Sequence, residues 1–379
     1  MSLDDQQVPF SPPSVTEGDI ERVVEVLRSR WLSTGAVSHE LEERLAERLG
    51  APFVVAVSSC TAALEISLRS LRLPPGARVG VPAWTFVASA SSIVHAGGTP
   101  VLLDVEPDSL NLSPDAVASA IDAGLDGLVV VHFAGAPVDE SIHALAAGAG
   151  IPVVEDAAHA LGATDHRGQM SGAGTVGACF SFYATKNLTS AEGGALATHD
   201  EDLARFARSQ RLHGLSNDAW DRYRVGGRTD YDMLEPGLKA NLPDLLAALA
   251  CSQLDRFDEM QAQRRALVER YRAGLSEIAG IDPLRGDDRS ADHLMVALLD
   301  EGIDRTEVVG CLGAAGIGTG IHFRPLHRFS WFAEHAEIGP GGVPVSEALA
   351  DRALSLPLHA ELRPGQVDRV LDVLADAVP

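Results

Sequence analysis

"SFYATKNLTSAEGGAL" (residues 181–196) joins an apolar run, a turn with Lys186, and a glycine pair that leads into a second apolar run. Of the 30 lysine and arginine residues in the chain, only Lys186 and Lys239 are lysines. Arginine serves as well as lysine at most exposed sites, but its guanidinium stays protonated and cannot act as a nucleophile. A desolvated lysine amine can lose its proton and form a Schiff base. Composition bias alone could also leave two lysines, so the surrounding sequence decides between these interpretations.

Apolar runs like the two in this stretch alternate with helical patterns through the first two thirds of the chain. The expected strands are residues 53–57, 78–82, 100–105, 127–133, 152–157, 178–183 and 194–198. Several are continuously apolar, which is typical of strands buried on both faces. The alternation predicts an α/β fold with a mostly parallel seven-stranded sheet flanked by helices. Ligands of such sheets bind at the carboxyl ends of the strands.

The pattern changes after the last of these strands. Apolar residues recur every three or four positions from Leu245 to Leu275, which predicts one long helix leaving the large domain. A smaller α+β region follows. We therefore expect a large α/β domain over residues 1–250 and a small C-terminal α+β domain over residues 251–379.

Charge and composition exclude several classes of function. A net charge of −23 argues against nucleic acid or an anionic membrane as a partner, because both require a basic face. No apolar run approaches the length of a membrane span, and the N-terminus has no signal-peptide pattern. The four cysteines lie far apart without a C-x-x-C pair, and the histidines show no H-E-x-x-H pairing. We expect a cytoplasmic protein without a metal site.

The stretch "FVVAVSSCTAALEISL" (residues 53–68) reads as a strand, a small polar turn and a helix. Ser59 or Thr61 can cap the helix, and the N–H groups of its first turn can bind an anion such as phosphate. An ordinary capped turn between a strand and a helix is the alternative.

The stretch "PVVEDAAHALGA" (residues 152–163) places Asp156 at the carboxyl end of a strand. This carboxylate could be solvated, could cap a helix beginning at Ala157, or could pair with a protonated heterocyclic nitrogen. His159 follows closely, and a polar residue in a helix turn is its alternative reading. In "PAWTFVASA" (residues 82–90), Trp84 and Phe86 are either core residues or a flat platform for a cofactor ring.

Together these stretches supply the parts of a pyridoxal 5'-phosphate site. Lys186 provides the Schiff-base amine, Asp156 an acid for the ring nitrogen, and the aromatic pair a stacking face. Ser181 and the helix beginning near Thr61 provide hydroxyl and N–H groups for the phosphate. This convergence favours a reactive role for Lys186.

Four longer motifs resemble the DegT/StrS sugar aminotransferases, a family of fold-type I pyridoxal phosphate enzymes. They are "EDAAHALGA" (155–163), "SFYATKNLTSAEGGALAT" (181–198), "GLKANLPDLLAALACSQLDRFDEM" (237–260) and "GIGTGIHFRPLH" (316–327). The resemblance covers nearly the whole chain and is particularly close to enzymes that aminate the 4-keto carbon of nucleotide-linked sugars.

The resemblance implies roles for the residues around the cofactor ring. Lys186 would hold the cofactor as an internal aldimine, and Asp156 would face the pyridine nitrogen. Phe86, rather than Trp84, aligns with the ring-stacking aromatic residue. His159 takes a place often held by glutamine near the ring hydroxyl. Family dehydratases carry histidine in place of the lysine, so Lys186 indicates an aminotransferase.

The resemblance also implies a phosphate cup and a shared site. Backbone around Cys60 and Thr61, with Ser181, aligns with the cup, although Cys60 stands where glycine or alanine is common. The small thiol leaves backbone donation intact and could make the site sensitive to oxidation. Asn241 matches an asparagine that reaches the cofactor phosphate of the neighbouring subunit, which implies a homodimer with shared active sites.

On the sugar side, two segments are candidates for substrate binding. Residues 216–233 combine aromatic residues with three arginines, among them Arg228, which suits a flap over a nucleotide diphosphate. Residues 318–327 contribute His322 and Arg324, with a structural turn as the alternative.

We therefore expect transamination of a nucleotide-linked 4-keto sugar, such as a dTDP- or UDP-4-keto-6-deoxyhexose, with glutamate as amino donor. The alternatives are an aminotransferase acting on a cyclitol or another non-nucleotide ketone, and a pyridoxal phosphate-binding regulator without turnover. The interpretation as a dinucleotide-binding oxidoreductase is disfavoured, because no G-x-G-x-x-G motif follows the first strand.

Overall fold

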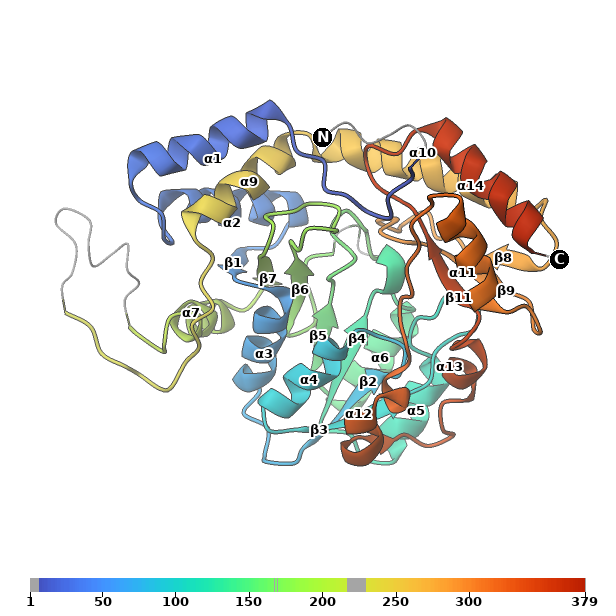
Figure 1. Ribbon diagram of the computed structural model, residues 1–379. Coiled ribbons are helices and arrows are strands. Elements are labelled where there is room, and N and C mark those ends of the chain that lie inside the picture. The colour runs from blue at the N-terminus through green and yellow to red at the C-terminus, as the bar shows by residue number, and fades with distance from the viewer. Residues whose placement is uncertain (1–6, 167, 169, 217–229, 379) are drawn as a thin grey trace.

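The computed structural model describes residues 7–166, 168, 170–216 and 230–378, and its centre is a large twisted sheet (Figure 1). The strand order is β1-β7-β6-β5-β4-β2-β3-β10. The strands are β1 (Phe53–Val57), β2 (Arg78–Pro82), β3 (Thr99–Leu103), β4 (Gly127–Val131), β5 (Val153–Asp156), β6 (Gly177–Ser181), β7 (Gly194–Thr198) and β10 (Glu337–Ile338). Only β7 runs antiparallel to its neighbours. The predicted seven-stranded, mostly parallel sheet is confirmed, and the two-residue β10 extends its edge.

Helices cover both faces of this sheet. The first part of the chain forms α1 (Glu17–Ser29), α2 (Ala36–Leu49), α3 (Cys60–Ser70), α4 (Val87–His95), α5 (Pro114–Asp122), the 3-10 turn η1 (Phe133–Gly135), α6 (Glu140–Ala149), α7 (Glu201–Gln210) and α9 (Asp244–Asp255). Apolar residues of α3, α4 and α7 pack on one face, and those of α2, α5, α6 and α9 pack on the other. Within β1, Val54 and Val55 belong to opposite faces, as the two-residue period of a strand requires.

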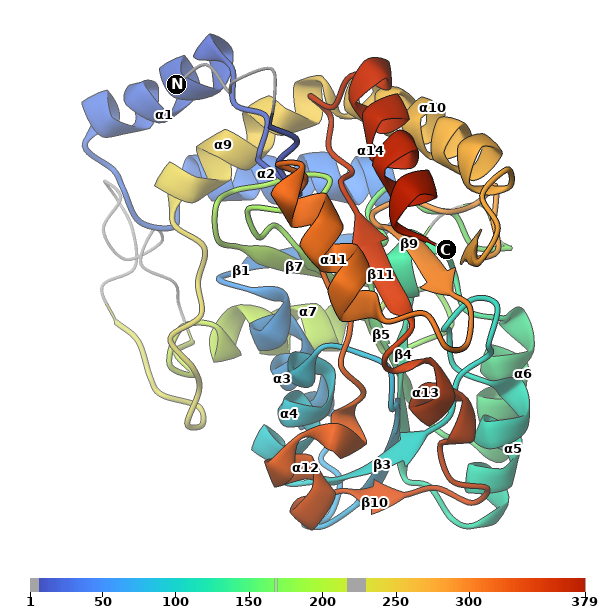
Figure 2. The same cartoon turned by 45° about the vertical axis from the view of Figure 1, so that its right-hand side comes forward.

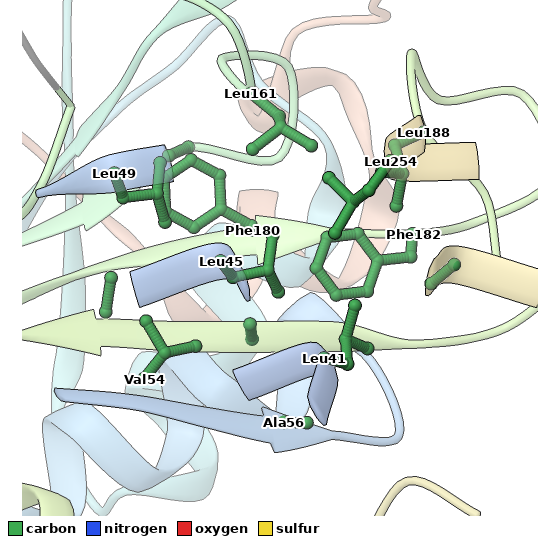
Figure 3. Packing of buried hydrophobic residues seen from close by; sticks show 14 of the residues in the cluster. Leu41, Leu45, Leu49, Val54, Ala56, Leu161, Phe180, Phe182, Leu188 and Leu254 are labelled. Carbon is green, nitrogen blue, oxygen red and sulfur yellow. The ribbon is translucent and has the colours of Figure 1, made fainter. Parts of the chain in front are cut away.

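Figure 3 shows the packing between the sheet and the α2–α9 face. The rings of Phe180 and Phe182 lie beside leucines of α2 and α9, including Leu45 and Leu254. Both phenylalanines are almost fully buried. Because Phe182 comes directly after β6 and just before the Lys186 turn, this packing anchors the start of that turn.

The C-terminal part of the chain forms a smaller unit beside the large sheet (Figure 2). It contains an antiparallel sheet in the order β11-β9-β8. Its elements are α10 (Phe257–Leu275), β8 (Ile281–Pro283), β9 (Met295–Leu299), α11 (Arg305–Ala314), β11 (Ala353–Leu356) and α14 (Pro364–Ala377). Between α11 and β11 the chain also forms η2 (Leu326–Arg328), α12 (Ser330–His335) and α13 (Pro344–Leu349), and Leu326 and Phe332 of η2 and α12 pack on the large sheet. Residues of α10, α11 and α14 share one apolar cluster with this sheet. The predicted α/β fold with a small C-terminal sheet domain is therefore confirmed.

The prediction of one long helix from Leu245 to Leu275 was wrong. The backbone leaves the helical region at Arg256, with φ −119° and ψ 12°, and α9 ends before it while α10 begins after it. The Arg256 guanidinium donates hydrogen bonds to the Ser14 carbonyl (2.7 Å) and Asp19 Oδ2 (2.8 Å). Because α9 packs on the large sheet and α10 on the small one, the two helices follow different partners and change direction between them (Figure 1).

The beginning of α9 caps the beginning of α2. Gly35, the residue before α2, offers no side chain to the free N–H groups of the first turn. Asp244 supplies the acceptors instead. Its Oδ1 accepts from the N–H groups of Gly35 (2.7 Å) and Ser38 (2.9 Å), and its Oδ2 accepts from that of Val37 (3.2 Å). The N-terminal ends of α2 and α9, which are far apart in the sequence, are therefore linked by hydrogen bonds.

Candidate active site

A cavity of about 460 Å³ lies where the carboxyl ends of β5 and β6 meet the N-terminus of α3 and the small C-terminal unit. This volume lies within the range of small-molecule sites. Nine of the residues singled out in the sequence line it: Ser59, Cys60, Thr61, Phe86, Asp156, His159, Ser181, Lys186 and His322. The cavity thus forms at the edge of the sheet where the topology places ligands.

Lys186 lies in the turn that follows β6 and is partly buried at the base of the cavity. Its backbone N–H donates to the carbonyl of Tyr183 at 2.9 Å, which closes the turn. Burial lowers the pKa of the amine to about 8, although the Asp156 carboxylate opposes the shift. At pH 7 an amine with this pKa is mostly protonated, but its unprotonated, nucleophilic fraction is on the order of a tenth, far larger than that of an ordinary lysine.

Asp156 ends β5 and is buried, so the solvated interpretation is wrong. Its Oδ2 accepts a hydrogen bond from Ser89 Oγ at 2.7 Å, and its Oδ1 accepts from the N–H of Ala158 at 3.1 Å. The thiol of Cys60 lies 3.7 Å from Oδ1. No helix begins at Ala157, because residues 157–163 form turns. Both carboxylate oxygens are therefore held by hydrogen bonds from the surrounding protein.

The N-terminus of α3 forms one wall of the cavity. Ser59 is the N-cap residue, and its hydroxyl accepts from the N–H of Ala62 at 3.2 Å. Gly194 of β7 passes directly beneath, since a Cβ at this position would lie 2.5 Å from the backbone N of Cys60. Only glycine permits this approach. The first-turn N–H groups at Cys60 and Thr61 form the kind of site that binds anions.

The thiol of Cys60 is buried beneath this wall. Burial, with the negative charge of Asp156 as a second cause, holds the pKa of the thiol well above its ordinary value. The thiolate is the reactive form of cysteine. The protonated thiol therefore disfavours the oxidation sensitivity expected from the sequence.

The two candidate aromatic residues, Trp84 and Phe86, lie in different environments. Trp84 is fully buried, and its Nε1 donates to the carbonyl of His322 at 3.1 Å. Phe86 is 56% exposed and lines the cavity. Of the two rings, only that of Phe86 faces space in which a flat ligand can stack.

His159 lies in a cluster of rings on the cavity wall. Its ring is stacked on Phe323, with centroids 5.9 Å apart, and lies 4.4 Å from His293. Burial, reinforced by the positive charge of Lys186, holds the pKa of His159 well below its ordinary value. His159 Nδ1 is buried and has no hydrogen-bond partner in the described parts of the chain. A neutral imidazole with an unused nitrogen can therefore meet a ligand group.

Other predicted residues lie outside the cavity lining. Asn241 Nδ2 donates to Thr34 Oγ1 at 2.7 Å, while its Oδ1 accepts from Lys239 Nζ. Asn241 does not cap α9, because Pro243 is the residue that precedes this helix. Arg324 is exposed, and its guanidinium lies over the ring of Phe329 at 5.2 Å.

Arg228 lies outside the described residues. His322, in contrast, joins the cavity wall through its ring, which is stacked on Phe10 with centroids 5.5 Å apart. Its Nδ1 lies 3.0 Å from Ser355 Oγ.

The sequence interpretation missed several residues of the site. Ser89, which holds Asp156, lies within a helix that the sequence shows only as small and apolar. His293 and Phe323 belong to the C-terminal part of the chain and reach the cavity through tertiary packing. The only sequence signal for His293 is a histidine placed shortly before the apolar strand β9.

Comparison with known families and curated proteins gives consistent matches. The sequence model of the DegT/DnrJ/EryC1/StrS aminotransferase family matches residues 13–375. The spore coat polysaccharide biosynthesis protein SpsC of Bacillus subtilis (strain 168) is 39% identical over 378 residues, which cover 98% of this chain and 97% of SpsC.

Solved structures agree with these matches. Spr1654 of Streptococcus pneumoniae, described as a sugar aminotransferase, is 32% identical with a TM-score of 0.88. The match covers 98% of this chain, 99% of the PMP-form and 98% of the PLP-form of that protein. Helicobacter pylori PseC, an aminotransferase involved in the biosynthesis of pseudoaminic acid, is 25% identical with a TM-score of 0.91, covering 98% of this chain and 99% of PseC.

Within residues 7–166, 168, 170–216 and 230–378, no group of three or more His, Cys, Asp or Glu side chains is arranged to hold a metal ion. The same ranges contain no helix whose length and apolar character would let it span a bilayer.

Proposed function

Since the chain belongs to the DegT/DnrJ/EryC1/StrS aminotransferase family, we propose that it transfers an amino group from glutamate to the 4-keto carbon of a nucleotide-linked sugar. The family makes it a pyridoxal phosphate-dependent sugar aminotransferase; the nucleotide, the 4-keto position and the donor are the proposed part. The observation that carries the proposal is the Lys186 amine, whose lowered pKa and place beside the buried Asp156 suit a reactive group.

The residues around the cavity fit pyridoxal phosphate. Cys60 and Thr61, in the first turn of α3, and Ser181 line the cavity, and their N–H and hydroxyl groups suit a phosphate. Phe86 offers an exposed ring face, and His159 Nδ1 offers a nitrogen without a partner among the described residues. When bound, the cofactor supplies an aldehyde that reacts with amines and a ring that accepts electrons from the substrate carbon.

The chain itself holds and moves protons around this group. Asp156, fixed by Ser89 and by the N–H of Ala158, is placed to keep the ring nitrogen protonated. The Lys186 amine would hold the cofactor and would serve as general base and then as general acid at the substrate carbon. Lys186 and Asp156 lie at the partly buried base of the cavity, where reduced contact with water strengthens their electrostatic interactions.

Substrate recognition is assigned to the open side of the cavity. His322, stacked on Phe10, lies on the cavity wall and is placed to contact the sugar. Arg324 and Arg228 are proposed to meet the diphosphate, because arginine pairs with phosphate through two parallel hydrogen bonds. Glutamate shares the region next to Lys186, since both substrates react there in turn.

A two-fold homodimer completes the proposal. Asn241 lies beside the end of β1, bridged to Val57, and outside its own cavity lining. Its partly exposed side chain, beside the edge strand β1, is proposed to reach the cofactor phosphate of a second subunit. The resemblance at "GLKANLPDLL" (residues 237–246) supports this role.

The direct test uses purified protein loaded with pyridoxal phosphate. Glutamate should bleach the yellow cofactor and yield 2-oxoglutarate, and a panel of nucleotide-linked 4-keto sugars should then restore the colour as one of them is aminated. Lys186→Arg is the matched control and should show neither change. Restoration only by a cyclitol ketone would overturn the proposed substrate, and a yellow protein that no amino donor bleaches would favour the regulator.

A further inference from the structure

The Lys186 amine has one close polar neighbour from the C-terminal part of the chain. Its Nζ lies 3.5 Å from Nε2 of His293. The His293 side chain is buried, 5% exposed, and lies two residues before the start of β9. The imidazole therefore reaches from the small C-terminal unit to the base of the cavity, where it faces the amine.

The protonation of the His293 ring follows from the hydrogen bonds of Asn187. Asn187 Nδ2 donates to the carbonyl of Ala291 at 2.7 Å and to Gln261 Oε1 at 3.1 Å. These two acceptors fix the orientation of the amide, so its Oδ1 faces His293 Nδ1 at 2.9 Å. Since an amide oxygen only accepts, Nδ1 of His293 must carry the proton. A neutral His293 then directs the lone pair of Nε2 toward Lys186.

The surroundings keep this ring neutral. Burial, together with the positive charge of Lys186, lowers the pKa of His293 well below its ordinary value, and His159, Arg264 and His322 act in the same direction. Arg264 also donates to the backbone carbonyl of His293 at 3.2 Å. The neighbouring carboxylate, Asp292, lies 3.7 Å from the guanidinium of Arg265.

We propose that His293, held as the Nδ1–H tautomer by Asn187, is a positioning residue that accepts a hydrogen bond from the Lys186 amine and fixes the direction of its lone pair. This inference rests on the proposed function, in which Lys186 is the reactive group. One N–H of the neutral amine donates to Nε2, so the nitrogen lone pair is held in a defined direction toward the cavity. The ammonium form donates to the same atom, so the side chain keeps its place as it gains and loses a proton.

Substitutions at His293 separate this role from simple packing. His293→Leu fills the space but removes the acceptor, and the first half-reaction with glutamate should slow on the order of tenfold to a hundredfold through kcat. His293→Gln keeps an acceptor oxygen and should stay within roughly threefold of wild type. Equal losses in both variants, or none in either, would overturn the proposal.

Substitution of Asn187 gives a signature in the pH profile. In Asn187→Asp, a carboxylate facing Nδ1 favours the imidazolium form of His293. A protonated Nε2 cannot accept from Lys186. Activity should therefore fall at low pH and recover as pH rises above the new pKa of His293, whereas wild type lacks this step. The double variant Asn187→Asp with His293→Gln is the matched control, because it keeps the new carboxylate but has no imidazole to protonate and should lack the step.

A spectroscopic measurement needs no turnover. Nitrogen-15 chemical shifts of His293 in the apoprotein, assigned by comparison with His293→Gln, should show a protonated Nδ1 and an unprotonated Nε2 at neutral pH. An imidazolium or an Nε2–H tautomer would overturn the proposal. These results are independent of the substrate. If the Nδ1–H tautomer is observed but no keto sugar is aminated, the proposed function is wrong while the inference about His293 stands.

Discussion

The hydroxyl of Ser89, from α4, donates a 2.7 Å hydrogen bond to Oδ2 of Asp156 at the end of β5. Ser89 is fully buried, and its hydroxyl also contacts that of Thr85 at 2.9 Å. The bond joins a helix on one face of the sheet to the strand end that borders the cavity. The carboxylate is thereby fixed before any ligand binds, which is the preorganisation that electrostatic catalysis requires.

Asp156→Asn should bind the cofactor but lower kcat on the order of a hundredfold or more, because a neutral amide does not hold a ring nitrogen protonated. The first half-reaction with glutamate, followed by stopped-flow absorbance, measures this loss. Ser89→Ala is an informative companion, since it removes one donor and should give a smaller loss. An unchanged rate in Asp156→Asn would leave Asp156 with only its structural role at the turn.

Lys186→Arg and Lys186→Ala should both abolish transamination while the protein stays folded. Arginine keeps the positive charge and much of the length but not a reactive amine. Circular dichroism and thermal unfolding check the fold, and the coupled assay with glutamate and keto sugar checks turnover. Turnover near the wild-type rate in Lys186→Arg would show that another group reacts.

The lowered pKa of Lys186 predicts a pH-dependent stability of the apoprotein. The pKa is about 8 in the folded state against an ordinary value of 10.5. Below pH 8 both states hold the proton, and the folded state carries the full cost of burying the charge. Between about pH 8 and 10.5 the unfolded state binds more protons, so the free energy of unfolding rises with pH. The expected gain is on the order of 2 kcal/mol, allowing for the partial exposure of the side chain.

Lys186→Met isolates this contribution, because methionine does not titrate. Urea unfolding of both apoproteins at pH 7 and pH 10 gives the difference in stability at each pH. The free energy of unfolding of wild type should increase relative to that of Lys186→Met as pH rises. Parallel behaviour of the two proteins would mean that Lys186 keeps an ordinary pKa.

Substitutions on the sugar side should separate the two substrates. Charge removal in Arg324→Gln, and likewise in Arg228→Gln, should raise KM for the keto sugar more than KM for glutamate. Loss of the ring in His322→Ala should act in the same direction, because it removes a residue of the cavity wall. Steady-state kinetics with both substrates varied gives the two KM values. Proportional increases in both would refute this division between substrates.

Asn241 offers a test of the shared site. Lys186→Ala and a disabling change such as Asn241→Leu should each inactivate a homodimer. Hybrid dimers made by co-expression contain one site with Lys186 from one chain and Asn241 from the other, both intact, so activity should return. Differential tags verify that hybrids form. Inactive hybrids would place the action of Asn241 within its own subunit.

The sequence predicted the large sheet closely because its strands are buried on both faces. The bounds expected for β1, β2 and β7 agree with the structure, since continuous apolar runs between turn residues leave little choice. The cavity residues that follow these strands were found for the same reason, because strand ends meet at one edge. Lys186 and Asp156 are examples.

The features that the sequence did not predict depend on contacts between segments that are far apart in the chain. His293 reaches Lys186 only because the small sheet packs beside the large one, and nothing local marks that meeting. The break at Arg256 likewise follows from different packing partners for α9 and α10 and not from a helix-breaking residue. Periodicity records which face of a helix is apolar but not which neighbour covers it.

The cap that Asp244 provides for α2 has a consequence for synthesis on the ribosome. The N–H groups of Gly35, Val37 and Ser38 find their acceptor 206 to 209 residues further along the chain. As the nascent polypeptide emerges, α2 therefore stays uncapped until nearly two thirds of the protein has been translated. The apolar face of α2 also waits for α9, so the segment is exposed to chaperones throughout that interval.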